Sequence, residues 1–376
     1  MLAEKTLTPP LWINQPQQLE ELAQALAMHT RLAVDTESNS LHAYREQVCL
    51  IQFSTPDRDY LVDPLVLTDL GSLESIFTDL KIEKIFHAAE YDLICLRRDF
   101  GIRVANIFDT MHAARVLGYA AVGLDKLLAE KFNIHVDKRH QKADWAARPL
   151  TKEQIHYARL DTHYLPDLRE VLEQELRDAG RWELAQEDFQ RASHPEMTRS
   201  VADKNAIHRF IGRRDISDRE LTILNELSQW RESIAEKMNR PLFKILSNEI
   251  LIALAREAPT HLVDLAGIGL SQRQIQLWGE MLLTAIRRGS VAPFVERKGT
   301  TRPDEAIQAR LEKLKTWRKK TAQEMGVESD IVLPRPYLSV LAERKLKDLS
   351  ELASLMSESP WRLKKFGEQI MTVVGG

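Results

Sequence analysis

The chain has 376 residues and a formal net charge of -3, and 44% of its residues are hydrophobic and 28% charged. This composition is typical of a globular protein and excludes a disordered or membrane-embedded one, because no run approaches about 18 apolar residues. At about 150 residues per domain, we expect two or three domains. The near-neutral charge gives no global sign of nucleic-acid binding, so phosphate contacts would have to come from local clusters of Lys and Arg.

The N-terminal residues and the cysteines bear on the compartment. Met1 to Lys5 lack a basic region followed by an apolar stretch, so we expect neither export nor anchoring. Cys49 and Cys95 are the only cysteines, too few for a disulfide framework or a cysteine-rich zinc site. We expect both to be buried in a protein of the reducing cytoplasm.

Short β-rich runs alternate with helical runs in the first half, which predicts an α/β domain over residues 1–200. Strands are expected at residues 32–35, 48–53, 60–62, 84–87 and 104–108. The first three should run antiparallel because their short polar connections leave no room for helices, whereas helical segments precede the last two. The prediction is a mixed five-stranded sheet with flanking helices.

Helices are expected at residues 16–28, 73–80, 90–99, 111–117 and 124–132. A further helix should begin near Thr151, where Thr151-Lys152-Glu153-Gln154 has the pattern of a capping box. It should bend or restart at Pro166 and end near Gly180.

From about residue 205 the β-rich runs end and an internal repeat begins. Leu227-Ser228-Gln229-Trp230-Arg231 aligns with Leu314-Lys315-Thr316-Trp317-Arg318, and Trp278-Gly279-Glu280 aligns with Phe366-Gly367-Glu368. The paired Trp and Leu positions follow helical spacing and are expected in hydrophobic cores. The repeat predicts two small all-α domains at residues 205–290 and 304–376, joined by a linker at 291–303, with a boundary to the first domain near 192–201.

Asp35 and Glu37 stand at the end of a predicted strand. Residues i and i+2 of a strand face the same side, so the two carboxylates lie side by side and need a cation between them. The Asp-x-Glu pattern alone is weak, because Asp218-Arg219-Glu220 repeats it where a helix start explains the acids. A strand end in an α/β sheet is, however, a favoured place for a ligand site.

Three more residues join this pair. Asp92 lies one turn into a helix that follows a strand end, although it is also an ordinary N-terminal helix acid. Tyr157 and Asp161 share one helical face, although an exposed pair is the alternative. Occurring together, in order and on the expected elements, the four carboxylates predict a site for two divalent cations about 4 Å apart, which is an established way to hydrolyse a phosphodiester.

Here the chain resembles the DEDD exonucleases, in the branch with Tyr in the third motif. Asp35-Thr36-Glu37 matches the first motif, Asp92 in His87-Ala88-Ala89-Glu90-Tyr91-Asp92 the second, and Tyr157-Ala158-Arg159-Leu160-Asp161 the third. The resemblance implies a ribonuclease H-like fold. The repeated domain resembles HRDC, the helicase-and-ribonuclease-D C-terminal domain, and the whole arrangement resembles the bacterial ribonuclease D family, with the second HRDC-like copy the more divergent.

Roles follow for the residues of the predicted site. Asp35 is the best candidate to bridge two Mg²⁺ or Mn²⁺ ions. A free Tyr has a pKa near 10, so we expect Tyr157 to orient the attacking water rather than to take its proton. His156 is an alternative base, but it is turned by about 100° around the helix from Tyr157.

Several residues are candidate substrate contacts: Thr36, His87, Lys138, Lys142 and Trp145. His87 stands where many relatives carry Asn, and a satisfied strand-end residue is the alternative. Trp145 would stack on a base, or pack in the core. The basic clusters at residues 138–142, 213–214 and 313–320 would contact phosphate, or form solvated faces.

The resemblance implies removal of nucleotides from RNA in the 3'-to-5' direction with release of 5'-monophosphates, with tRNA precursors and other structured RNA as the substrate class. The residues themselves do not separate RNA from DNA, because that choice depends on contacts to the 2'-hydroxyl. The alternatives are a DNA-directed exonuclease, a non-catalytic nucleic-acid-binding domain on the same fold, and a scaffold built from repeats. A monomer without a membrane partner is favoured.

Overall fold

The computed structural model describes residues 8–193, 207, 210, 213, 215–297 and 304–375. The chain divides into two units, with residues 1–38, 48–195 and 302–376 in the first and residues 39–47 and 196–301 in the second. Met1 to Lys5, Arg214, most of the boundary predicted near 192–201 and the end of the predicted linker lie outside the described residues. Across the described ranges, no helix has the length and apolar character needed to cross a membrane.

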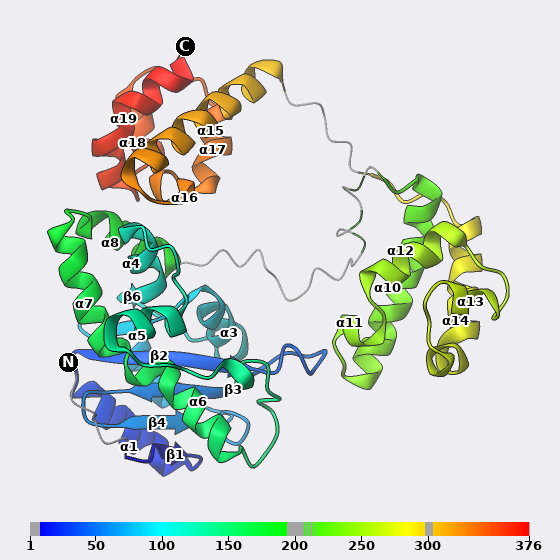
Figure 1. The fold of residues 1–376 in the computed structure, drawn as a ribbon, viewed down its shortest axis with the longest axis horizontal. Helices are drawn as coiled ribbons and strands as arrows, with labels where there is room; N and C mark the ends of the chain where they lie inside the picture. Colours follow the sequence, from blue (N-terminus) through cyan, green and yellow to red (C-terminus); the bar gives the residue numbers. More distant parts are fainter. Residues whose placement is uncertain are drawn as a thin grey trace. The chain divides into compact units, whose positions relative to one another are not determined.

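A mixed sheet forms the centre of the first unit (Figure 1). In the described part of the chain it has six strands in the order β1-β4-β3-β2-β5-β6. They are β1 (Leu11–Ile13), β2 (Arg31–Ser38), β3 (Val48–Ser54), β4 (Asp59–Val62), β5 (Glu83–Phe86) and β6 (Ile107–Asp109). The predicted antiparallel pairing of β2, β3 and β4 is confirmed, and β5 and β6 run parallel to β2. The predicted count of five omitted β1, which pairs in parallel with β4.

Two strands differ in extent from their predictions. β2 continues to Ser38 because β3 pairs with it as far as Val48, so Asp35 and Glu37 lie within the strand rather than at its end. β6 begins only at Ile107, because Asn106 has a φ of 52°. This left-handed backbone conformation interrupts an extended strand.

Helices cover both faces of the sheet. On one face α1 (Pro16–Ala27), α2 (Gly71–Thr78) and α3 (Glu90–Phe100) share a core with β2 and β3 that includes Leu22, Phe77 and Leu96. The other face carries α4 (Thr110–Leu117), α5 (Leu124–Phe132), α6 (Lys152–His163), α7 (Leu165–Asp178) and α8 (Trp182–Ala192), with the 3-10 turn η1 (Lys138–His140) between α5 and α6. Of these, α6 packs on β2, β3 and β4.

The predicted start of α6 is confirmed. Thr151 Oγ1 accepts a hydrogen bond from the Gln154 amide, and the Gln154 side chain accepts one from the Thr151 amide, which completes the capping box. The helix ends at His163, and α7 follows with Pro166 in its first turn. Proline lacks an amide hydrogen and therefore suits the start of a new helix rather than the interior of a long one.

The two C-terminal domains repeat one order of helices. The second unit contains α10 (Asp218–Met238), α11 (Leu242–Ile245), α12 (Asn248–Glu257), α13 (Asp264–Gly267) and α14 (Gln272–Val291). The first unit contains α15 (Glu305–Met325), α16 (Ser329–Val332), α17 (Arg335–Glu343), α18 (Leu349–Leu355) and α19 (Pro360–Gly375). Trp230 packs edge-on against Trp278, and Trp317 packs in the same way against Phe366, with ring centroids 5.9 Å and 5.8 Å apart.

Within the first unit, the C-terminal domain is joined to α8 by a buried ion pair. Arg362 of α19 is 0% exposed and donates hydrogen bonds to Glu187 at 2.8 Å and to Asp188 at 2.6 Å. Arg115 of α4 adds a contact to Asp330 at 2.6 Å. Buried charges need such partners, and these ion pairs link residues that belong to the same unit.

Candidate active site

Among the described residues, three acidic side chains converge above the sheet. Asp35 and Glu37 from β2 and Asp161 from α6 each place one carboxylate oxygen within 4.8 Å of the others. Val34 points into the core beneath α1 to α3. Because side chains alternate along a strand, Asp35 and Glu37 point to the opposite face, toward α6.

Asp92 lies beside this group, in the first turn of α3. The Thr36 hydroxyl donates a hydrogen bond to Asp92 Oδ1 at 2.5 Å and holds this carboxylate, which is 6% exposed. The charge of Asp92 is near enough to raise the pKa of Asp35 and of Asp161. Thr36 therefore orients an acid of the site, and its contact with substrate stays a prediction.

Burial and mutual repulsion make these acids hard to ionise. Burial, and then the charges of Asp92, Asp161 and Glu37, raises the pKa of Asp35 well above its usual value. Burial and the neighbouring acids raise the pKa of Glu37 in the same way. Burial is also the main reason why the pKa values of Asp92 and Asp161 rise to about 7. Hard oxygen donors at this density fit divalent cations, which would relieve the repulsion.

Tyr157 borders the carboxylates and is 8% exposed. Burial, and then the charges of Asp161, Glu37 and Asp35, raises the pKa of its phenol far above the usual value. The hydroxyl therefore stays protonated at neutral pH, when it acts as a hydrogen-bond donor. His156 is exposed on α6, so the buried tyrosine is the better placed of the two toward the acids.

A buried polar network that was not among the predicted site residues holds α6 on the sheet. Arg159 of α6 donates to Asp59 of β4 at 2.5 Å, and His163 Nδ1 lies 2.9 Å from the same carboxylate. Ser54 of β3 donates to Asp59 at 2.7 Å and lies 2.7 Å from the Thr162 hydroxyl. A signal was present in the sequence, because Arg159 and His163 occupy positions i and i+4 of the helix that carries Asp161.

The predicted substrate contacts have different environments. His87 is half-buried, its Nδ1 lies 2.9 Å from the Thr110 hydroxyl, and burial lowers its pKa. Lys138 forms an ion pair with Asp125 at 2.6 Å. Lys142 is exposed. Trp145 is 1% exposed and packs against Tyr157 with ring centroids 6.0 Å apart, which corrects the stacking proposal in favour of a core residue.

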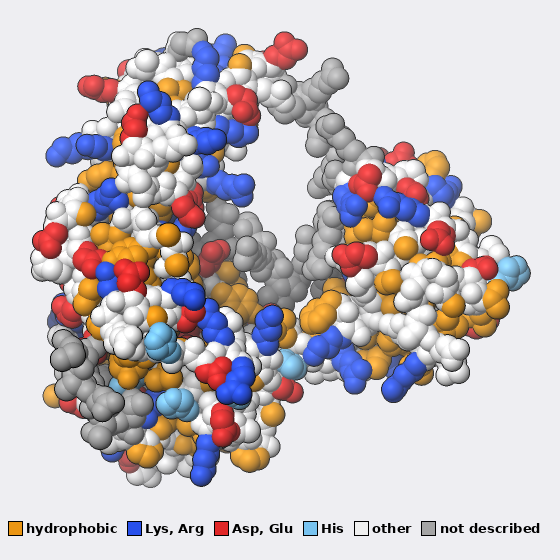
Figure 2. Space-filling model, in the orientation of Figure 1, with side chains coloured by type: hydrophobic (Ala, Val, Ile, Leu, Met, Phe, Trp, Pro, Cys, Tyr) orange, Lys and Arg blue, Asp and Glu red, His pale blue; other side chains and the backbone are white. Residues whose placement is uncertain are grey.

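The basic clusters contain many ion pairs. Arg139 pairs with Asp137 at 2.6 Å, Arg213 with Asp215 at 2.7 Å, and Lys315 with Glu312 at 2.7 Å. On the face drawn in Figure 2, Lys and Arg side chains are interspersed with Asp and Glu. Contacts to phosphate from these clusters remain a prediction.

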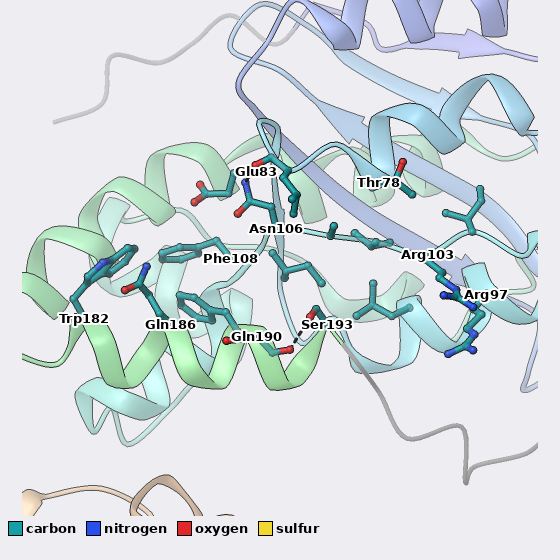
Figure 3. Close-up of a pocket in the computed structure, with 17 residues that line it drawn as sticks. Thr78, Glu83, Arg97, Arg103, Asn106, Phe108, Trp182, Gln186, Gln190 and Ser193 are labelled. Atoms are coloured by element: carbon teal, nitrogen blue, oxygen red, sulfur yellow. Dashed lines mark hydrogen bonds between the residues drawn. The ribbon is translucent and has the colours of Figure 1, made fainter. Parts of the chain in front are cut away.

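Two cavities of the first unit differ in their relation to the acids. A cavity of about 380 Å³ lies beside Tyr157 and is lined by three histidines, His135, His140 and His156. A larger one of about 820 Å³ lies along β6 and α8, with Trp182 and Phe108 toward one end and Arg97 and Arg103 toward the other (Figure 3). The residues that line the larger cavity include none of the predicted catalytic residues.

Comparison with known proteins shows which protein families the sequence matches. The sequence pattern described as 3'-5' exonuclease matches residues 10–177, and that of the HRDC domain matches residues 220–286 and 307–374. The chain is 32% identical to the exosome complex exonuclease RRP6 of Saccharomyces cerevisiae over 69% of its own length and 37% of the relative's. It is 31% identical to the protein RRP6-like 1 of Arabidopsis thaliana, over 81% of its own length and 51% of the relative's. The chain thus spans a third to a half of the length of these relatives.

Solved structures agree with the fold. Ribonuclease D of Escherichia coli superposes with a TM-score of 0.71 at 24% identity and covers 98% of this chain and 99% of its own. The catalytic core of RRP6 from Trypanosoma brucei superposes with a TM-score of 0.63 at 26% identity, over 77% of this chain and 81% of its own. The predicted α/β and all-α fold classes are confirmed. The chain belongs to the family of DEDD 3'-5' exonucleases that carry HRDC domains, the family of the RRP6-like proteins.

Proposed function

We propose that this protein is a 3'-to-5' exoribonuclease that hydrolyses the terminal phosphodiester bond of RNA and releases 5'-mononucleotides. The observation that carries the proposal is the convergence of Asp35, Glu37 and Asp161, with Asp92 and Tyr157 beside them. Water adds to the phosphorus, and the bond to the 3'-oxygen of the preceding nucleotide breaks. That oxygen leaves with a proton as the new 3'-hydroxyl.

The four carboxylates would hold two divalent cations, Mg²⁺ or Mn²⁺. Bound cations would supply an activated water and stabilise the charge that develops on the departing oxygen. The chain itself contributes orientation. Tyr157 keeps its proton and donates a hydrogen bond that positions the attacking water, and Thr36 fixes Asp92.

The proposed substrates are the 3' ends of structured RNA, including tRNA precursors, in the cytoplasm. Support comes from two sources. The matched Escherichia coli ribonuclease D is described as an exoribonuclease involved in structured RNA processing. The chain has two cysteines, Cys49 and Cys95, which are too few for a disulfide framework and suit a reducing compartment.

The test is parallel digestion of a 5'-labelled RNA and of a DNA strand of the same sequence, with Mg²⁺, by the wild type, Asp35→Ala and Asp161→Asn. We expect a ladder that shortens from the 3' end of the RNA for the wild type, and digestion slowed by roughly three orders of magnitude for either variant. Digestion of DNA alone would identify a DNA-directed exonuclease. RNA that is bound but never shortened would identify a non-catalytic binding domain.

A further inference from the structure

Gln52 has a buried side-chain amide whose role the fold alone does not explain. It lies in the middle of β3 and is 0% exposed, and neither Nε2 nor Oε1 has a hydrogen-bond partner among the residues that the structure describes. Its chain neighbours, Ile51 and Phe53, are apolar core residues. A buried amide without partners destabilises a fold, so its presence in this strand requires an explanation.

The register of the sheet places Gln52 directly across from Asp35. The two residues are partners in the antiparallel pair of β2 and β3. Such partners have Cα atoms about 4.5 to 5.5 Å apart, and their side chains lie on the same face of the sheet. The partner of Gln52 on its other side is Leu61 of β4, so Asp35 is the polar one of its two direct cross-strand neighbours.

The face that they share is the one under α6. Ile51 and Phe53 point into the core on the opposite side, and Ser54, two residues beyond Gln52, lies 2.7 Å from Thr162 of α6. By strand alternation Gln52 points the same way as Ser54. The amide thus lies between the sheet and α6, the helix that carries Tyr157 and Asp161.

We propose that Gln52 is a positioning residue for Asp35, to which its Nε2 donates a hydrogen bond when a divalent cation is bound. The inference rests on the cation site of the proposed function. Carboxylates that bind a cation are commonly held by a hydrogen-bond donor behind them, which fixes their orientation. A neutral amide suits this place better than Lys or Arg, because a positive charge beside Asp35 would compete with the cation.

The decisive variant is Gln52→Leu, which keeps the approximate volume and removes the amide. We expect the melting temperature of the cation-free protein to be equal to or above that of the wild type, because an unpartnered polar group is lost. The Kd for Mn²⁺, measured by titration calorimetry, should rise at least about 10-fold. The rate of RNA hydrolysis should fall in parallel.

Ser228→Ala is the matched control, because the Ser228 hydroxyl is also buried without a partner but belongs to α10 of the second unit. It should leave the Mn²⁺ affinity unchanged. A Gln52→Leu protein whose Kd for Mn²⁺ lies within twofold of the wild-type value would show that Gln52 only fills space, and would overturn the proposal.

Gln52→Glu gives an independent readout. It adds a further carboxylate across from Asp35, so the cation-free protein should melt at a lower temperature, and the gain in melting temperature on adding Mn²⁺ should exceed that of the wild type. An unchanged gain would contradict the placement of Gln52.

The behaviour of the wild type separates this inference from the proposed function. A wild type that binds Mn²⁺ but hydrolyses no RNA would refute the proposed function alone, because the Kd values of the wild type and Gln52→Leu could still be compared to decide the role of Gln52. A wild type that binds no Mn²⁺ would refute both.

Discussion

Asp161 shows how the same residue opposes folding and supports catalysis. Its pKa is raised to about 7, first by burial and then by the charge of Asp92. A carboxyl whose pKa is raised by folding contributes stability at low pH, and that stability is lost as the pH rises through about 7. At pH 8 the ionised group therefore destabilises the cation-free protein.

Asp161→Asn should consequently raise the melting temperature of the cation-free protein at pH 8, by about 2 to 4 °C for each kcal/mol gained. It should also remove most of the stabilisation by Mn²⁺. Hydrolysis of RNA should fall by roughly three orders of magnitude, because cation contacts supply several kcal/mol to the transition state. Thermal unfolding with and without Mn²⁺ checks the first two points, and a lower melting temperature without cation would contradict the repulsion.

Tyr157→Phe separates orientation from cation binding. The ring would still pack against Trp145, and only the hydroxyl, which forms a hydrogen bond with Asp161, would be lost. The melting temperature and its gain on adding Mn²⁺ should therefore stay close to the wild-type values. Loss of the donor should slow hydrolysis about 10- to 100-fold. Single-turnover rates at saturating RNA measure this effect, and a rate equal to that of the wild type would assign the orientation of the water to another group.

At the scale of elements, local signals predicted the fold around the site well. The capping box at Thr151, the restart of the helix near Pro166 and the antiparallel order of the first strands each depend on neighbouring residues, and each is confirmed. β1 was missed because three residues form a strand only through their distant partner β4. The proposed role of Gln52 could not be predicted from neighbouring residues either, because it depends on the register that pairs Gln52 with Asp35.

Asp59 tests how α6 is held on the sheet. Burial opposes ionisation of this carboxyl, but hydrogen bonds from His163 and Ser54 outweigh burial and lower its pKa. A lowered pKa gives stability that is present above the unfolded pKa of about 3.9 and lost as the pH falls through the folded value.

Asp59→Asn should therefore destabilise the protein at pH 7 by about 3 kcal/mol, because it leaves Arg159 buried without its counter-charge. The difference from the wild type should shrink as the pH falls toward 3. Urea unfolding at several pH values measures both effects. A difference that is independent of pH would show that packing, and not the charge of Asp59, holds the helix.

At the scale of the whole molecule, the internal repeat predicted two domains of one type but not their different surroundings. The C-terminal copy is joined to α8 by Arg362, whose side chain is fully buried between Glu187 and Asp188. The position that aligns with Arg362 in the first copy is Gln274, which caps α14 instead. Nothing in the repeat pattern itself distinguishes these two roles.

Arg362→Ala should destabilise the first unit by about 3 to 5 kcal/mol, because two buried carboxylates lose their partner. Arg344→Ala, at an exposed position of the same domain, is the control and should have little effect. Thermal unfolding monitors both variants. Equal stability of Arg362→Ala and the wild type would show that the C-terminal domain does not depend on this ion pair for its attachment.

We propose that Asp35, Glu37, Asp92 and Asp161 together hold two divalent cations. Anomalous scattering from a crystal of the protein soaked in Mn²⁺ tests it most directly. We expect two manganese peaks about 4 Å apart between these carboxylates in the wild type, and their loss in Asp35→Ala. Manganese bound elsewhere, or four carboxylates that stay too far apart to share the ions, would contradict it.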